Sequence, residues 1–491
     1  MSSPLASPAA RRIPFVLVVL ATGIPMFMAT LDNLVITNAL PVIHAELGAT
    51  VEELQWFINA YTLVFASLIL LVVGLGDRLG RRTIFIAGIA IFTLASIAAA
   101  LSTDPTQLIV ARAIQGIGGA GIMLLSLSLL SGAVESKRRP LAIGIWGGLA
   151  GLGVAVGPLL GGAIVEGLNW QSIFWINVPV GILAIPFVLW VLPNAFGARV
   201  RLDVPGVVLA GLGVLGLVFG IVRGNDAGWD SFEVLGALIG GGVLIAAFLF
   251  WESRTASPLL PLRLFRDRSF SIANVVGFGF SFGMFGAVFI LIQFLQVVQG
   301  ASPLEAAIQT TPWTLAPMIV APIAGIVMPR VGTRILIVSG LTLQAAGLIW
   351  LSATMTADVP YTTMLPAFIA AGIGMSLVFA PSSTAVLANL APHDTAKGSG
   401  TNSTVREIGV ALGIAVLTAV FVGAGGELTP TGYVDAAVPA VAVGGAVLLA
   451  TAIVALFLPA GRGRPAETGS IEQPELGELT ARDGKQSLVD A

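Results

Sequence analysis

Residues 144–162 read GIWGGLAGLGVAVGPLLGG, a stretch with no charged side chain and with glycines spaced four residues apart. Positions four apart share one face of an α-helix, so Gly153, Gly157 and Gly161 would expose backbone against which a second helix can pack closely. Pro158 lacks an amide donor and predicts a bend in that helix. A helix so rich in glycine is weak in water but is expected in a bilayer, where the backbone has to satisfy its own hydrogen bonds. By this physics alone, a generic packing helix remains an equal alternative to a functional element.

The composition of the whole chain is that of an integral membrane protein. Of its 491 residues, 56% are hydrophobic and 10% are charged, and the mean hydropathy is +0.95; about 25% charged residues are typical of soluble domains. The net charge of −2 offers no basic surface for nucleic acid, and no lysine lies in a phosphate-binding loop, so we expect no nucleic acid or nucleotide partner. The chain has no cysteine and only two isolated histidines, so we expect no metal site and no cofactor.

Fourteen apolar segments are long enough to cross a bilayer as helices of about 20 residues. They predict an all-α integral membrane fold with fourteen transmembrane helices. The segments are residues 13–36, 52–74, 83–101, 106–131, 141–165, 173–192, 204–222, 233–251, 270–298, 304–328, 334–356, 360–389, 398–422 and 434–458.

The placement of basic residues supports this number of spans. With the N-terminus in the cytoplasm, nineteen Lys and Arg residues before the distal tail fall on the cytoplasmic side, and only Arg223 falls on the other. The positive-inside rule predicts such a bias for a correct set of spans, because one missing helix would scramble it. We therefore expect a multi-pass protein of the cell (plasma or inner) membrane with both termini in the cytoplasm.

The spans form two groups of six with a two-helix insert between them. Residues 78–82 (RLGRR) and 330–334 (RVGTR), at matching places in the two groups, share Arg-x-Gly-x-Arg, as expected for parallel halves of a transporter. The expected parts are a cytoplasmic N-terminus (1–12), an N-terminal six-helix bundle (13–195), the insert with its flanking loop (196–258), a C-terminal six-helix bundle (259–459) and a disordered cytoplasmic tail (460–491), which is too polar to fold alone.

The order of glycines and proline in the opening stretch resembles the fifth-helix antiporter motif of the major facilitator superfamily. Every fixed position of that motif is present: Gly144, Gly153, Gly157, Pro158, Gly161 and Gly162. The resemblance implies an exporter that exchanges its substrate for protons by alternating access. It counts against a symporter that imports a nutrient, which remains the less favoured alternative.

Residues 77–82 (DRLGRR) resemble the loop between the second and third spans of the same family, although Gly74 stands one position later than the family's first glycine. The resemblance implies a charged cytoplasmic gate, and the alternative is a solvated basic loop that only sets the topology. In the second half, Arg406 and Glu407 stand where the family commonly has an Arg-Gln pair. They are expected to pair with each other or with this gate, and Glu407 is a minor candidate for a second proton carrier. The expected gate residues are Asp77, Arg78, Gly80, Arg81, Arg330, Arg406 and Glu407.

Residues 108–119 (LIVARAIQGIGG) resemble the fourth-span motif, and residues 31–33 (LDN) with 39–41 (ALP) resemble the first-span motif of the fourteen-span drug antiporters. Arg112 lies about 9 Å inside its span, where a charge is costly and is a functional candidate by default. Asp32 is the carboxylate of the first span, and an acid there can exchange a proton for a cation. The alternatives are an arginine that snorkels to the interface and an aspartate in water at its helix end. Proton coupling is therefore expected at Asp32, Arg112 and Gln115.

These resemblances cover nearly the whole chain and identify it as a member of the fourteen-span, proton-coupled drug antiporter branch. The expected substrates are hydrophobic or amphipathic small molecules, with cationic ones among them, moved by the proton gradient through a protein surrounded by lipid. A dedicated exporter of one antibiotic, metabolite or lipid fits equally. An enzyme is not expected, because no cluster of catalytic groups is visible. The candidate substrate-binding residues are Asn59, Tyr61, Phe282, Phe285, Gln293 and Trp313.

Overall fold

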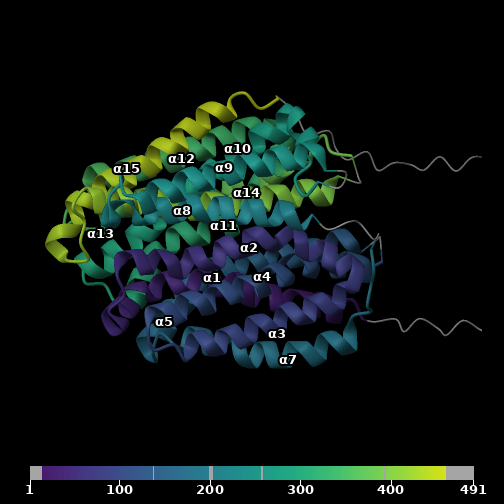
Figure 1. The fold of residues 1–491 in the computed structure, drawn as a ribbon. Helices are drawn as coiled ribbons and strands as arrows, with labels where there is room; N and C mark the ends of the chain where they lie inside the picture. The colour runs from purple at the N-terminus through teal and green to yellow at the C-terminus, as the bar shows by residue number, and fades with distance from the viewer. Residues whose placement is uncertain (1–13, 136–137, 198–202, 256–257, 392–393, 460–491) are drawn as a thin grey trace, which may run out of the picture.

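The computed structural model describes residues 14–135, 138–197, 203–255, 258–391 and 394–459. The predicted N-terminal segment 1–12 and the predicted tail 460–491 lie outside these residues. Figure 1 shows the described part as a bundle of long helices, with the N-terminal helices (purple to blue) below and the C-terminal helices (green to yellow) above. No β-strand occurs among the described residues.

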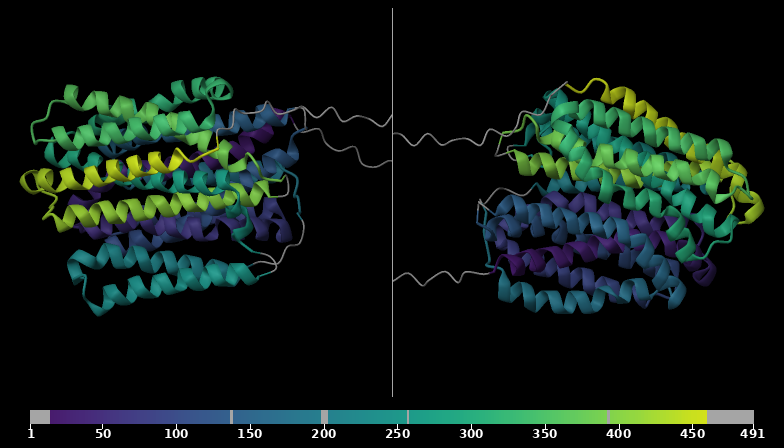
Figure 2. Two further views of the ribbon diagram at one scale, coloured as in Figure 1. Left: turned by 90° about the horizontal axis from the view of Figure 1, so that it is seen from above. Right: turned by 180° about the vertical axis from the view of Figure 1, so that it is seen from behind.

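The N-terminal half begins with five long helices, and its sixth span is broken. These elements are α1 (Phe15–Leu47), α2 (Val51–Leu79), α3 (Arg81–Ala100), α4 (Pro105–Ala133), α5 (Arg139–Gly167), α6 (Ser172–Trp175) and α7 (Asn177–Val191). The insert is the hairpin of α8 (Val204–Ala227) and α9 (Phe232–Arg254). Figure 2 shows this hairpin, in teal, at the periphery of the molecule.

The C-terminal half repeats the arrangement after a short 3₁₀ turn. Its elements are η1 (Leu262–Arg266), α10 (Arg268–Gln293), the π-helical η2 (Phe294–Val298), α11 (Pro303–Val331), α12 (Thr333–Thr354), α13 (Tyr361–Leu387), α14 (Thr395–Gly423) and α15 (Pro430–Ala455). Thirteen of the described helices, with α6 and α7 taken as one, are long and apolar enough to span a membrane. The 29-residue α2 is not one of these thirteen, but it packs against α4 within the bundle. With α2 included, the helices correspond to the fourteen predicted segments.

Helix starts are stabilised by side chains that bond to free backbone amides. Thr50 and Glu53 form a reciprocal capping box at α2, and Ser302 and Glu305 form one at α11. Each box satisfies two amides that a helix start leaves without a partner. Glu305 is therefore a helix-capping residue at the start of α11.

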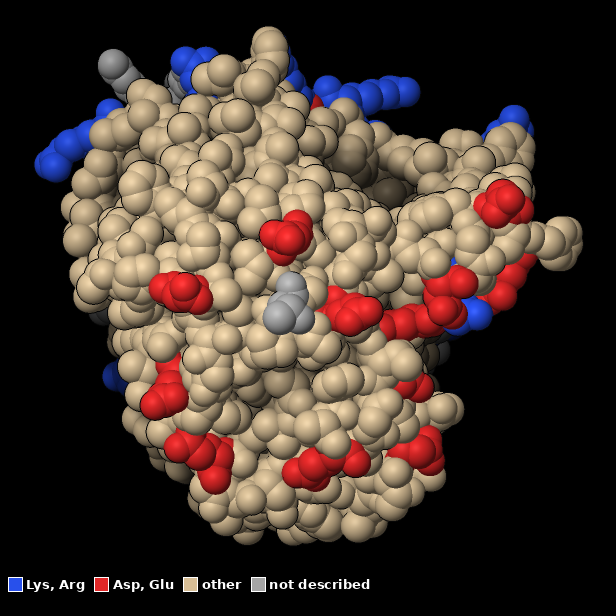
Figure 3. Space-filling view, turned by 90° about the vertical axis from the view of Figure 1, so that its left-hand side faces the viewer, with Lys and Arg blue, Asp and Glu red and all other residues tan. Residues whose placement is uncertain are grey.

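The two halves meet where α5 packs on α11, where α2 packs on α14, and where α1 packs on α10 and α11. The ends of the helices differ in charge. At one end, called here the basic end, α1 begins and α15 ends, and the loops carry Arg78, Arg81, Arg82, Arg138, Arg139, Arg254, Arg263, Arg266, Arg268, Arg330 and Arg334. At the opposite, acidic end, Figure 3 shows acidic side chains scattered over the face, and Arg223 is the basic residue among the described ones there.

Candidate functional site

A buried polar cluster surrounds Asp32 in the middle of α1. The carboxylate accepts hydrogen bonds from Arg112 Nη1 at 2.6 Å, from Gln115 Nε2 at 2.9 Å and from Asn177 Nδ2 at 2.6 Å. Asp32 is 2% exposed and Arg112 is 0% exposed. The sequence predicted that Asp32, Arg112 and Gln115 act together, and the structure places all three side chains in one hydrogen-bonded group.

Further contacts fix the guanidinium of Arg112. Its Nε donates to the carbonyl of Phe57 at 3.0 Å, its Nη1 also donates to Gln115 Oε1 at 2.6 Å, and its Cζ lies 4.6 Å from the ring centre of Tyr61. A charge at this depth is tolerated only when it is paired and hydrogen-bonded. The interpretation of Arg112 as a snorkelling side chain is therefore wrong, because the group points inward to Asp32.

The sequence analysis missed two members of the cluster. Ser96 Oγ accepts a hydrogen bond from Gln115 Nε2 at 3.0 Å, and Asn177 opens α7 directly after the break in the sixth span. Asn177 is 1% exposed. A polar amide at the start of an otherwise apolar span was the available signal, since an amide in that position needs a buried partner.

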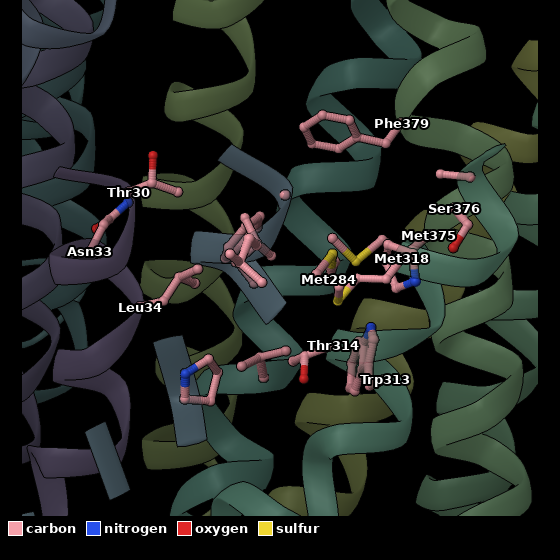
Figure 4. A pocket seen from close by; sticks show the side chains of 18 of the residues that line it. Thr30, Asn33, Leu34, Met284, Trp313, Thr314, Met318, Met375, Ser376 and Phe379 are labelled. Carbon is pink, nitrogen blue, oxygen red and sulfur yellow. The ribbon is translucent and has the colours of Figure 1, made fainter. Parts of the chain in front are cut away.

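A cavity of about 650 Å³ lies between the two halves. Figure 4 shows Thr30, Asn33 and Leu34 of α1 on one side and Met284, Trp313, Met318, Met375 and Phe379 of the C-terminal half on the other. Its wall is mainly apolar and aromatic, and among the described residues the charged groups in it are Arg406 and Glu407. Such a wall suits a bulky apolar ligand with few polar groups.

The cavity separates Asp32 from Arg406 and Glu407, and it corrects the expected location of the latter two residues. Asp32 does not line it: the neighbours Asn33 and Leu34 do, while Asp32 faces α4 and α7 on the other side of α1. Arg406 and Glu407 do line it, and they do not join the gate at the basic end. Arg406 lies eleven residues beyond the first residue of α14, about 17 Å along the helix, which carries both groups toward the centre of the membrane.

The environments of Arg406 and Glu407 are different. The guanidinium of Arg406 stacks over Phe379, with Cζ 4.1 Å from the ring centre, while its buried Nε has no hydrogen-bond partner. Glu407 makes no hydrogen bond or ion pair with the described residues. An unpaired carboxylate in an apolar cavity is stabilised by a proton or by a cationic ligand.

The candidate substrate-binding residues divide into two groups. Tyr61, Phe285 and Trp313 line the cavity. The other three lie outside its wall: Asn59 is fully buried, Phe282 packs against Gly413 of α14, and Gln293 donates to the carbonyl of Phe289 at 2.9 Å. Helix periodicity did not separate these groups, because helices of this bundle are apolar on every face.

The glycine motif on α5 packs in two different ways. Toward the acidic end, a Cβ added to Gly153, Gly157 or Gly161 would lie 2.9–3.3 Å from atoms of α1, and one added to Gly162 would lie 2.5 Å from the carbonyl oxygen of Pro303 on α11. Toward the basic end, an added Cβ at Gly144 would meet nothing within 4 Å. The carbonyl of Pro158 accepts a hydrogen bond from Asn38 at 3.1 Å. The part of the motif from Gly153 to Gly162 is therefore a tightly packed seam, and its first residue, Gly144, has free space beside it.

At the basic end, Asp77 and Arg81 form an ion pair of 2.7 Å at one helix junction. Gly80 joins α2 to α3 with φ +100°, a conformation that favours glycine. The backbone amide of Gly197, after α7, donates to the carbonyl of Asp77 at 3.1 Å, so this junction is tied to the end of the sixth span. Arg78 and Arg330 are exposed at this end, on α2 and α11 respectively.

The acidic end is closed between the halves. Glu166, at the end of α5, accepts hydrogen bonds from the hydroxyl of Ser302 and, at 3.3 Å, from the amide of Leu304 at the start of α11. Gln296 Nε2 donates to the carbonyl of Asn38 on α1 at 3.1 Å. The cavity is thus sealed toward the acidic end, whereas the part of α5 near the basic end has free space beside it.

A membrane-embedded pair of six-helix halves that encloses a central cavity, closed at one end and carrying a buried ion pair beside its wall, is the architecture of a secondary transporter. The family described as "Major Facilitator Superfamily" matches residues 23–295 and 273–488. The chain belongs to the major facilitator superfamily. It is a multi-pass membrane protein.

Relatives and solved structures agree with this assignment. The chain is 36% identical over 445 residues to "Cephamycin export protein CmcT" of Amycolatopsis lactamdurans, covering 88% of this chain and 90% of that protein. It is 34% identical over 406 residues to "Multidrug resistance protein Stp" of Mycobacterium tuberculosis (strain CDC 1551 / Oshkosh), covering 82% and 75%. The fold matches a crystal structure of a bacterial homologue of the human lysosomal transporter Spinster, with a TM-score of 0.64, 18% identity and coverage of 90% and 96%.

Proposed function

We propose that the protein exports hydrophobic or amphipathic small molecules, including cationic ones, in exchange for protons by alternating access. The basic end faces the cytoplasm with both termini, and the described conformation is open to that side. The six-helix halves, residues 13–195 and 259–459, rock about the central cavity, and residues 196–258 form the insert and its connection. Relatives named for multidrug resistance and for antibiotic export support the export direction.

The observation that carries the proposal is the Asp32–Arg112 pair, buried directly behind the cavity wall. Asp32 faces the N-terminal half while the next residue, Asn33, faces the cavity. A proton on Asp32 removes the charge that holds Arg112 and Gln115, so it changes the forces on α1 and thereby on the substrate site. Asp32 is in this scheme the proton site, with Arg112 and Gln115 as its coupling partners.

Glu407 is the competing proton site, because it lies in the cavity itself and lacks a partner among the described residues. A cationic substrate can displace a proton from it directly. The tight seam at Gly153, Gly157, Gly161 and Gly162 lets α5 tilt between the halves, and the Asp77–Arg81 pair steadies the basic end when that end closes.

A second candidate is a dedicated exporter of one antibiotic. Several relatives carry the name of a single compound, such as the cephamycin exporter at 36% identity and the "Tetracenomycin C resistance and export protein" of Streptomyces glaucescens at 32%. The mechanism is the same, and only the breadth of the substrate range differs.

The test is proton release upon substrate addition in proteoliposomes with an imposed pH gradient. A panel of lipophilic cations and neutral drugs is added to the wild type, Asp32→Asn, Glu407→Gln and the control Glu305→Gln, whose carboxylate only caps α11. We expect substrate-dependent proton movement in the wild type and the control, and none in Asp32→Asn. Release that survives in Asp32→Asn but is lost in Glu407→Gln moves the proton site to the cavity. If no compound of the panel causes proton release by the wild type, multidrug antiport is contradicted.

A further inference from the structure

Two arginines lie deep within the spans, and their environments are opposite. Arg112 donates hydrogen bonds to Asp32, to Gln115 and to a backbone carbonyl. Arg406 makes no hydrogen bond or ion pair with the described residues. A guanidinium carries five N–H donors and stays charged in proteins, so Arg406 needs an anionic partner wherever water is excluded.

The side chain of Arg406 is held in place from two sides. Its Cζ lies 4.1 Å from the ring centre of Phe379 on α13, and its stem packs on α10, where a Cβ added to Gly277 would lie 3.1 Å from Arg406 Cγ. Its Nε is buried without a hydrogen-bond partner, while its two Nη groups are open to the cavity that the residue lines. A guanidinium fixed in this way loses little conformational freedom when it binds an acid group.

The next residue, Glu407, brings the opposite charge to the same cavity. Neighbouring residues of an α-helix point about 100° apart, and the side chains of Arg406 and Glu407 form no ion pair with each other. The mainly apolar wall thus carries one unpaired positive group and one unpaired negative group. Both are costly in such surroundings unless a ligand pairs with them.

A ligand with a single charge pairs with only one of these groups. A lipophilic monocation pairs with Glu407 and is repelled by Arg406, and a lipophilic monoanion has the reverse problem. A zwitterion offers a partner to each group and brings no net charge into the cavity. Its carboxylate can accept two parallel hydrogen bonds from a guanidinium, which is the strongest pairing that an arginine makes.

We propose that Arg406 and Glu407 form a binding site for zwitterionic amphiphiles, in which the guanidinium binds the carboxylate of the substrate and Glu407 binds its ammonium group. This inference rests on the proposed function and specifies the substrate class. The apolar part of the substrate lies against aromatic and thioether side chains of the cavity such as Trp313 and Met318 (Figure 4). Closure of the basic end expels water from both charged groups, so a bound zwitterion favours closure by replacing that water.

The first test compares three probes on the purified wild-type protein. Nε-dansyl-lysine is a zwitterion, its methyl ester is a cation, and its Nα-acetyl form is an anion. All three carry the same dansyl group, so energy transfer from the cavity-lining Trp146 and Trp313 reports the binding of each. We expect the zwitterion to bind about tenfold more tightly than either singly charged probe. A zwitterion that does not bind, or that binds no more tightly than the ester or the acetyl form, overturns the proposal.

The second test assigns each charge of the probe to its residue. We expect Arg406→Gln to weaken the zwitterion and the acetyl form about tenfold and to spare the methyl ester. Glu407→Gln should weaken the zwitterion and the ester and spare the acetyl form. The control is Arg254→Gln, which removes a guanidinium stacked 5.0 Å over Phe250 outside the cavity and should bind all three probes as the wild type does.

A folded Arg406→Gln variant that weakens all three probes equally contradicts the assignment of the carboxylate to Arg406. If Arg406→Gln does not fold, Arg406→Lys decides the point, because it keeps the positive charge. It should still bind the zwitterion more tightly than the ester, and a variant that binds both equally counts against the proposal.

These binding measurements separate the zwitterion site from the export proposal. If lipophilic cations cause proton release by the wild type but the zwitterion binds no better than its ester, antiport stands and the zwitterion site fails. If the zwitterion binds as expected but neither it nor the panel causes proton release, the site stands and antiport fails.

Discussion

Asp32 and Arg112 neutralise each other in a place that water does not reach. Removing one partner leaves a buried, unpaired charge, which costs about 3–5 kcal/mol, whereas removing both charges leaves a neutral site and costs less. We therefore predict that Arg112→Leu lowers the melting temperature more than the double variant Asp32→Asn/Arg112→Leu. Thermal unfolding in detergent, with size-exclusion chromatography as the readout, measures the order of the two melting temperatures.

The partly exposed ion pairs of Arg223 with Glu52, Asp226 and Glu233 at the acidic end supply the control for that experiment. Arg223→Gln breaks the pair with Glu52 near the membrane surface, where screening by water leaves a surface ion pair worth less than about 1 kcal/mol. Its melting temperature should stay close to that of the wild type. If Arg112→Leu is as stable as Arg223→Gln, the Asp32 cluster does not hold a charge in the membrane.

At the scale of single residues, the sequence indicated which polar residues lie together better than it indicated which side of each helix lines the cavity. Asp32, Arg112 and Gln115 were grouped correctly because a charge within an apolar span requires a partner. Arg406 and Glu407 were assigned to the wrong place, because their depth depends on α14 beginning at Thr395. Asn59 and Gln293 lie outside the cavity wall, and no periodicity indicates which side of an all-apolar helix is the cavity side.

At the scale of helices, α5 joins the two halves through Gly162. A methyl group there would lie 2.5 Å from the carbonyl oxygen of Pro303, so Gly162→Ala forces α5 and α11 apart at the acidic end. We predict a longer distance between spin labels on Leu168→Cys and Asp358→Cys, measured by double electron–electron resonance. The chain has no native cysteine, so these labels need no other change.

Gly167→Ala is the matched control, because an added Cβ five residues further along α5 meets nothing within 4 Å. The control should give the distance distribution of the parent. If Gly162→Ala also gives the distance distribution of the parent, the added methyl group is accommodated by local shifts. The contact between α5 and α11 then does not hold the acidic end closed.

The long helices were predictable, and their interruptions were not. Apolar runs and the charge bias set the number of spans, because the bilayer fixes both the length of a helix and the side on which arginine stays. The break at Ile176 between α6 and α7 and the π-helical η2 after Gln293 depend on packing against other helices, so no local pattern marks them. The mode of packing of each motif glycine likewise depends on neighbours far away in the chain.

At the scale of the whole molecule, the charge difference between the two ends predicts its orientation. Alkaline phosphatase is active only outside the cytoplasm, so a fusion after Ala424, at the acidic end, should be active, and a fusion after Val134, at the basic end, should be inactive. Green fluorescent protein at the same sites should give the opposite pattern. Activity after Val134 would reverse the orientation and with it the direction of export.

Alternating access also requires a state in which the basic end closes. In the described state, Gly148 lines the cavity and an added Cβ meets nothing within 4 Å, so Gly148→Phe fits there but obstructs closure of the basic end. We predict that Gly148→Phe keeps its stability, loses transport and retains a long distance between spin labels on Glu135→Cys and Ala388→Cys under all conditions. Gly240→Phe, in open space on α9, is its control.

Gly148→Phe and Gly162→Ala should act in opposite directions, since the first disfavours the state closed at the basic end and the second disfavours the state closed at the acidic end. The two sites are about 21 Å apart along α5, far enough for their free-energy effects to add. We therefore predict that the double variant has a distance distribution between those of the single variants at both ends. A double variant that matches Gly148→Phe at the basic end and Gly162→Ala at the acidic end would mean that the two ends move independently, and the two halves would then not rock as rigid bodies.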